Sequence, residues 1–181
     1  MDYSKAFHLV AKASKKSGVP CILIGGFAVN FHKVSRNTLD VDFLTTKDDF
    51  NKIEAALADS GYSEDFAGDV TVRMSNKKEG LDIDFMIVDA ATRAKILKDG
   101  IETEVVSEKL VVPSVEHLIA LKLHAIKCNP KNRMWKDLPD IIKLIKANKI
   151  DYESEPFRGN CMKFGSGDIY GKICGLMSGD L

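Results

Sequence analysis

Two pairs of aspartates stand where they could hold a metal ion. Asp40 and Asp42 lie two residues apart in the run LDVDFL (residues 39–44), which alternates apolar and acidic residues as a strand does. Because side chains alternate across a strand, both carboxylates leave the same face, within about 7 Å of each other. Two carboxylates so close repel each other unless a cation neutralises them or they share a proton. The pair therefore predicts a site for a hard divalent cation such as Mg²⁺.

The same alternation returns in LDIDFMIV (residues 81–88), where Asp82 and Asp84 share a face. A single D-x-D pair often marks only an exposed strand face, but two pairs within strongly apolar strands favour a functional site. One of the later aspartates can complete a three-carboxylate site for two metal ions, about 3.5 to 4 Å apart. We expect Asp40, Asp42 and Asp84 to be the catalytic metal ligands, with Asp82 as the alternative third carboxylate.

A pair of glycines, Gly25-Gly26, follows a strand-like run (residues 21–24) and precedes a short apolar helix (residues 27–31). Glycines allow a tight turn, and amide groups at a helix N-terminus favour an anion such as a triphosphate. A plain turn is the other interpretation. The spacing favours the first, because Asp40 comes fifteen residues after Gly25 (40 − 25), enough for a short helix and a return in the neighbouring strand.

The motif G-G-x-A at residues 25–28, the D-x-D of residues 40–42 and the acidic strand at residues 81–86 together resemble the nucleotidyltransferase superfamily that includes DNA polymerase β. The stretch containing Lys122, Lys136, Asp137 and Asp140 is similar to a lysine-and-D-x-x-D region of the abortive-infection type nucleotidyltransferase toxins. This resemblance implies that Lys122 and Asp137 contact the nucleotide. Phe27 stands where many members of the superfamily place a serine that bonds the triphosphate.

The resemblance implies transfer of a nucleotide from a nucleoside triphosphate to a hydroxyl acceptor, with release of pyrophosphate and with two Mg²⁺ ions, or Mn²⁺ in their place. The acceptors that it implies are an RNA such as the 3′ end of tRNA, a protein hydroxyl or a small molecule. It also implies a role in a toxin–antitoxin system with a partner protein. The alternative is a catalytically degenerate protein of the same fold that binds a nucleotide or a partner without turnover.

Lys122 is unusual for a reason independent of the resemblance. At 100° per residue, it falls in the middle of the apolar face of the helix expected over residues 115–127. A lysine is almost never buried unpaired, so its ammonium must meet an acidic side chain or point into an anion site. Asp137 could reach it, or could simply be a first-turn acid of the next helix. Trp135, amid basic residues, is interpreted either as a base-stacking residue or as a loop aromatic that caps a core.

The remaining pattern predicts an α+β fold in which a mixed β-sheet nucleotidyltransferase core is flanked by helices. The runs at residues 70–75 and 81–88 are separated by a turn at residues 76–80, which predicts antiparallel neighbours. From Pro113 onward the pattern is helical. We expect a catalytic core over residues 1–112 and a C-terminal helical segment over residues 113–181, packed on the core.

Net charge and hydrophobicity limit the kinds of partner that we expect. The 181 residues include 26 basic and 26 acidic side chains, so no overall field draws a polynucleotide to the molecule, and any contact with RNA must use a local patch. The chain has no run approaching the ~20 apolar residues of a membrane span and no visible export signal. We therefore expect a cytoplasmic protein that does not enter a membrane.

Overall fold

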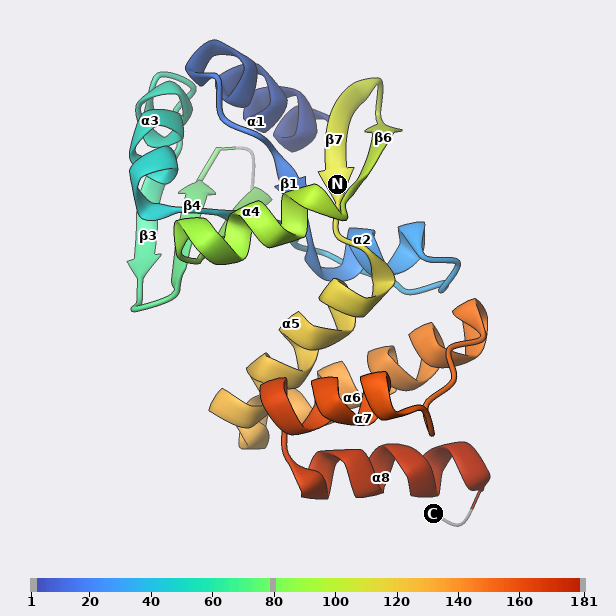
Figure 1. Cartoon of the computed structure of the whole chain (residues 1–181). Coiled ribbons are helices and arrows are strands. Elements are labelled where there is room, and N and C mark those ends of the chain that lie inside the picture. Colours follow the sequence, from blue (N-terminus) through green and yellow to red (C-terminus); the bar gives the residue numbers. More distant parts are fainter. Residues whose placement is uncertain (1–2, 79–80, 180–181) are drawn as a thin grey trace. The chain divides into compact units, whose positions relative to one another are not determined.

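The computed structural model describes residues 3–78 and 81–179, and within these ranges the chain forms one seven-stranded sheet and eight helices (Figure 1). The strands are β1 (Ile22–Leu23), β2 (Val41–Thr45), β3 (Ser63–Ala67), β4 (Thr71–Asn76), β5 (Leu81–Ile87), β6 (Ile101–Val105) and β7 (Glu108–Val112). The helices are α1 (Ser4–Ser17), α2 (Gly25–Phe31), α3 (Lys47–Ala58), α4 (Ala90–Lys98), α5 (Val115–Cys128), α6 (Pro130–Asn148), α7 (Glu155–Phe164) and α8 (Gly167–Ser178).

The sheet is mixed, with the strand order β3-β4-β5-β2-β1-β7-β6. Strand β2 runs parallel to β5 and antiparallel to β1, and β4 runs antiparallel to β5. The predicted α+β class with a mixed sheet and late helices is thus confirmed. Strand β3 was not predicted, because its sequence SEDFA is exposed throughout and lacks the apolar alternation of a half-buried strand. Two residues of the predicted turn, Glu79 and Gly80, lie outside the described residues.

The chain divides into two compact units, which are described separately below. The first comprises residues 1–28 and 36–114, and the second comprises residues 29–35 and 115–181. Across the described residues of both, no helix is long and apolar enough to cross a membrane.

In the first unit, one face of the sheet packs against α1 and α3. Phe7 of α1 meets Phe43 of β2 edge to face, with 6.1 Å between ring centroids, and Phe50 of α3 meets Phe85 of β5 at 5.2 Å. Thr46 caps α3 by accepting a hydrogen bond from the Asp49 amide. Because neighbouring positions in a strand face opposite ways, the residues beside these phenylalanines project from the other face of the sheet.

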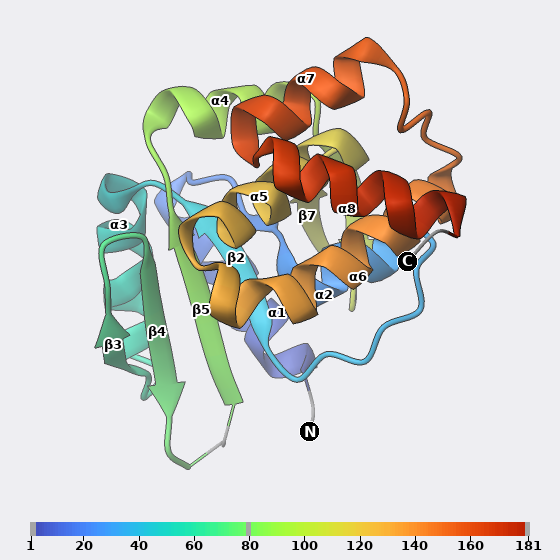
Figure 2. The same cartoon turned by 90° about the horizontal axis from the view of Figure 1, so that it is seen from below.

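The second unit is helical (Figure 2): α5 packs on α6 and α7, and α8 packs on α6 and α7. Its core contains fully buried aliphatic side chains such as Leu123, Ile141 and Leu144. The short segment 29–35 belongs to this unit, and Asn148 at the end of α6 donates a hydrogen bond to the His32 carbonyl at 3.0 Å.

Candidate active site

The two predicted D-x-D motifs lie side by side in the sheet of the first unit. Asp42 of β2 and Asp84 of β5 are directly opposite each other in a parallel pairing. Residues in register on adjacent strands project to the same face, with backbones about 4.8 Å apart. Asp82 lies two residues before Asp84 in β5 and so shares its face, and Asp40 comes just before β2, two residues from Asp42. The structure therefore brings the predicted carboxylates together.

An arginine lies among these carboxylates. Arg73 of β4 is opposite Asp84, and its guanidinium makes a two-pronged contact: Nε donates to Oδ1 at 2.7 Å and Nη2 donates to Oδ2 at 2.8 Å. Its Nη1 also lies 3.9 Å from Asp82 Oδ2. Ser75 donates a hydrogen bond to Asp82 Oδ1 at 2.7 Å. Both of the later aspartates are thus held in place by β4.

The charge of Arg73 is stabilised by its surroundings. The hydrogen bond to Asp84 and the charges of Asp84, Asp82 and Asp40 raise the pKa of the guanidinium above its ordinary value. Arg73 was not predicted as a site residue. Arg73 alternates with the apolar residues Val72 and Met74, which puts it on the polar face of its own strand but does not say which residue of β5 lies opposite it.

Gly25 brings its backbone close to Asp42. It has φ +64°, a backbone conformation that residues with a side chain rarely adopt. A Cβ added there would lie 1.9 Å from Asp42 Oδ2. A Cβ on Gly26 would lie 2.4 Å from Thr38 Oγ1. The neighbouring Ile24 amide donates to the Asp42 carbonyl at 2.9 Å. Both glycines are therefore required by close approach, and the first of them sets the backbone of α2 beside one of the predicted metal ligands.

The donor set suits a hard divalent cation, because carboxylate oxygens on one face are what Mg²⁺ and Mn²⁺ prefer. The described residues contain no group of three His, Cys, Asp or Glu side chains already arranged around a metal position. The positive charge beside Asp84 is instead that of Arg73. The residue types and the sheet face that they share fit a metal ion. To bind that ion, the Asp84 carboxylate must either be shared with the Arg73 guanidinium or be released by it.

Lys122 and Asp137 meet inside the second unit. The Lys122 ammonium donates to Asp137 Oδ1 at 2.9 Å and to Asp140 Oδ2 at 2.7 Å, and all three side chains are almost completely buried. Arg133 lies 3.8 Å from Asp137 Oδ2, an atom that accepts no hydrogen bond from the described residues. Lys122 thus has the acidic partners that its place on an apolar helix face requires.

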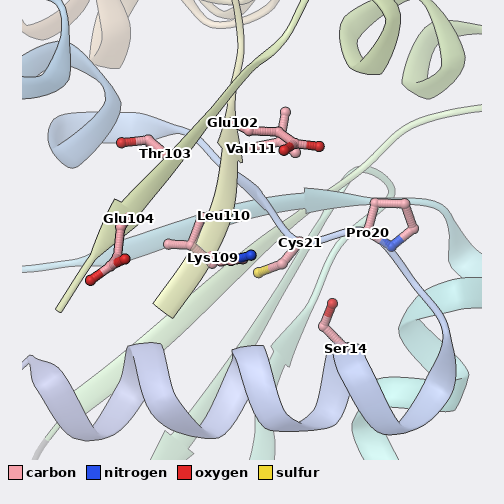
Figure 3. A pocket seen from close by; sticks show the side chains of 9 residues that line it. All are labelled: Ser14, Pro20, Cys21, Glu102, Thr103, Glu104, Lys109, Leu110 and Val111. Carbon is pink, nitrogen blue, oxygen red and sulfur yellow. The ribbon is translucent and has the colours of Figure 1, made fainter. Parts of the chain in front are cut away.

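A cavity of about 480 Å³ lies elsewhere in the first unit, between α1 and the β6–β7 hairpin (Figure 3). Ser14 of α1, Cys21 and the side chains of both hairpin strands line it. None of the described aspartates of β2 and β5 contributes to its wall. Burial raises the pKa of the Cys21 thiol well above its ordinary value, so this cysteine is a poor nucleophile. Cys21 therefore gives this cavity no ready thiolate.

Comparison with protein families gives one match that spans most of the chain. The family model described as "Nucleotidyl transferase of unknown function (DUF2204)" matches residues 3–167. No curated protein matches the sequence.

Several solved structures share the fold. ANT(2″)-Ia in complex with adenylyl-2″-tobramycin superposes with a TM-score of 0.56 at 15% identity, over 98% of this chain and 98% of that one. The lincosamide antibiotic adenylyltransferase LnuA, with lincomycin bound, gives a TM-score of 0.54 at 15% identity, over 81% of this chain and 98% of that one. A protein of Thermotoga maritima described as a putative nucleotidyltransferase gives a TM-score of 0.54 at 17% identity, over 74% of this chain and 91% of that one. At these identities the likeness shows the nucleotidyltransferase fold.

Proposed function

The chain belongs to this family of nucleotidyltransferases, and we propose that it transfers a nucleotide from a nucleoside triphosphate to a hydroxyl acceptor in a metal-dependent reaction. Residues 1–112 form the proposed catalytic core, and residues 113–181 form a helical segment that serves it. In this reaction the acceptor oxygen forms a bond to the α-phosphorus, the bond between the α-phosphorus and the bridging oxygen breaks, and pyrophosphate leaves. The proposed location is the cytoplasm, where nucleoside triphosphates are available.

The observation that carries the proposal is the register of β2 against β5. It sets Asp42 directly opposite Asp84 on one face of the sheet, and the turn at Gly25 approaches the same Asp42 carboxylate. A carboxylate pair next to a glycine turn is an arrangement for a cation and the phosphate oxygens that it binds.

The same register favours Asp84 over Asp82 as the third carboxylate. The backbone of Asp84 is one strand spacing from Asp42, whereas Asp82 is displaced by two further residues, which makes its separation from Asp42 about 8 Å. We propose Asp40, Asp42 and Asp84 as ligands for two divalent ions, Mg²⁺ or Mn²⁺. Bound there, the ions would neutralise the triphosphate and lower the pKa of the acceptor hydroxyl.

The protein's own groups have distinct proposed roles. Asp84 accepts the proton of the acceptor hydroxyl as that oxygen attacks. Gly25 and Gly26 would contact the phosphate oxygens through their backbone amides, which lie at the start of α2. Arg73 keeps the Asp84 carboxylate oriented before the cation and the triphosphate arrive.

Lys122 and Asp137 remain proposed nucleotide contacts, and Asp137 Oδ2 supports this role. It is a buried acceptor that receives no hydrogen bond from the part of the chain described, and the Arg133 guanidinium lies 3.8 Å from it. A small side-chain movement that exposed this oxygen would let it accept a hydrogen bond from a ribose hydroxyl. Lys122 itself would act mainly by holding Asp137 in place.

The proposed acceptor is an RNA end or a protein hydroxyl. The small-molecule acceptors of similar proteins, an aminoglycoside and a lincosamide, extend the range to test. The experiment supplies each α-labelled nucleoside triphosphate with Mg²⁺ and, in turn, total RNA, lysate protein and an aminoglycoside. Label that appears in one acceptor class with wild-type protein, and not with Asp42→Asn, supports the proposal. Label in no class, with no pyrophosphate released, supports the alternative of a degenerate nucleotide- or partner-binding protein.

A role in a toxin–antitoxin pair is a further part of the proposal and rests on the resemblance to nucleotidyltransferase toxins. Expression of the wild-type chain should then arrest growth, and Asp42→Asn should relieve the arrest. Equal growth of cells that express the two proteins would remove this role and leave the enzymatic proposal intact.

A further inference from the structure

One face of α6 in the second unit is strongly basic. Lys131, Lys143 and Lys146 are exposed on it and Lys136 is half-buried. At 100° per residue, these positions and Trp135 fall within about 140° of the helix circumference, and from Lys131 to Lys146 they extend over about 22 Å of its length. The opposite face of α6 is apolar and buried within the unit: Leu138, Ile141, Leu144 and Ile145.

Within α6 itself, no acidic side chain interrupts this basic face. Between His117 and Ile150 the acids of the sequence are Asp137 and Asp140, and both are buried in contact with Lys122. The balanced charge of the whole chain therefore conceals a local excess of positive charge. This is the kind of local patch that a polyanion requires of a protein without net charge.

Trp135 stands in the middle of the basic face. It is the only tryptophan of the chain, and 72% of it is exposed. It lies in helix α6 and caps no core, so the interpretation as a loop aromatic is wrong. An indole is large and apolar, and its exposure amid lysines has no role in the packing of the unit.

We propose that this basic face, formed by Lys131, Trp135, Lys136, Lys143 and Lys146, binds a single-stranded nucleic acid that is the acceptor of the nucleotidyl transfer. The lysines neutralise successive phosphates, and a base stacks on the indole of Trp135. The inference rests on the proposed function, since it names the acceptor class. A single strand fits better than a duplex, because stacking on an exposed aromatic needs an unpaired base. A membrane fits poorly, because the apolar side of α6 is already buried.

The sole tryptophan gives a direct measurement. Titration of the wild-type protein with a single-stranded RNA oligonucleotide, without nucleoside triphosphate, should quench the emission of Trp135. Four lysine–phosphate contacts predict a slope of about −3 for the logarithm of the association constant against the logarithm of salt concentration, or a loss of about fifty-fold between 50 and 200 mM salt.

Variants test the two contributions separately, with a fluorescent oligonucleotide as the reporter. Trp135→Ala should weaken binding by about five- to a hundred-fold, the range for loss of one stacked base, and Trp135→Phe should restore most of it. The triple variant Lys131→Glu, Lys143→Glu, Lys146→Glu should reduce the salt slope to about −1. The matched control reverses three exposed lysines of α1: Lys12, Lys15 and Lys16. It makes the same change in net charge and should retain wild-type affinity to within about two-fold.

Three results would overturn the inference: equal loss of affinity in the α1 control, equal affinity of Trp135→Ala and wild type, or stronger binding to duplex RNA or to vesicles with anionic lipid than to the single strand. RNA and DNA strands of one sequence, each offered with labelled nucleoside triphosphate, identify which is extended. The binding assay contains no triphosphate, so its failure overturns the surface alone. Intact strand binding without any pyrophosphate release would instead overturn the proposed function.

Discussion

Removal of the Lys122 ammonium should destabilise the protein severely, because two buried carboxylates lose the cation that donates to both of them. Lys122 donates to both Asp137 and Asp140, whose side chains are 5% and 4% exposed. Each hydrogen bond of this charged kind contributes about 1.5 to 3 kcal/mol, and removal of one partner of a buried ion pair costs about 3 to 5 kcal/mol. We therefore expect Lys122→Met to lower the free energy of unfolding by about 3 to 5 kcal/mol.

Urea unfolding monitored by circular dichroism measures this loss. The triple variant Lys122→Met, Asp137→Asn, Asp140→Asn removes the stranded charges and should recover most of the stability. The matched control is Lys172→Met, which breaks an exposed ion pair with Asp168 on α8 and should change stability by less than about 0.5 kcal/mol. If Lys122→Met unfolds at the same urea concentration as the control, the buried cluster does not support the helical unit and the reasoning is refuted.

Three further predictions follow from the first unit and from α7. Arg73→Met should lower the free energy of unfolding of the metal-free protein by only about 1 kcal/mol, because Arg73 is partly exposed. The variant should also show a larger rise in melting temperature when Mg²⁺ is added, because Asp84 no longer has a competing cation. A rise equal to that of the wild type would contradict this prediction. Gly25→Ala should lower the free energy of unfolding, measured by a thermal melt, by about 1 to 2 kcal/mol. It should also abolish pyrophosphate release, because the added Cβ would displace the Asp42 carboxylate. Retained activity would contradict this role of the close approach. Burial raises the pKa of Cys161 to about 11, so about one thiol in a thousand is ionised at pH 8. Mass spectrometry should therefore find Cys161 alkylated by iodoacetamide in urea but not in the native protein.

The alternation of apolar and acidic residues was enough to predict both aspartate-bearing strands and the face that each D-x-D pair shares. It could not predict that β2 and β5 pair in parallel with Asp42 opposite Asp84, because strands separated by a helix and a hairpin carry no local signal of their pairing. That arrangement follows from packing of the whole sheet.

The contact between Arg73 and Asp84 depends on the register of β4 against β5 to within one residue. A turn over residues 76–80 would pair residue 75 with residue 81 and set Arg73 opposite an apolar position. In the structure Asn76 pairs with Leu81, which puts Arg73 opposite Asp84. A shift of one residue moves a side chain to the other face of the sheet, so the predicted length of a turn is too uncertain to identify such a contact.

Lys122 was predictable as a lysine in need of a partner, and the structure supplies two. The helical pattern located it on an apolar face, and Asp137 was one of the partners expected. The second partner, Asp140, was not identified as such, although it comes three residues after Asp137 and therefore lies on the same face of α6.

The most direct test of the central claim is the release of pyrophosphate from a nucleoside triphosphate in the presence of total RNA, with and without Mg²⁺. Wild-type protein should release pyrophosphate only with the metal, and Asp42→Asn should lose this activity while melting at or above the wild-type temperature in the absence of metal, because it removes one charge from a crowded acidic cluster. Added Mg²⁺ should raise the melting temperature of the wild type and do little for the variant. Pyrophosphate release by Asp42→Asn at the wild-type rate would contradict the account.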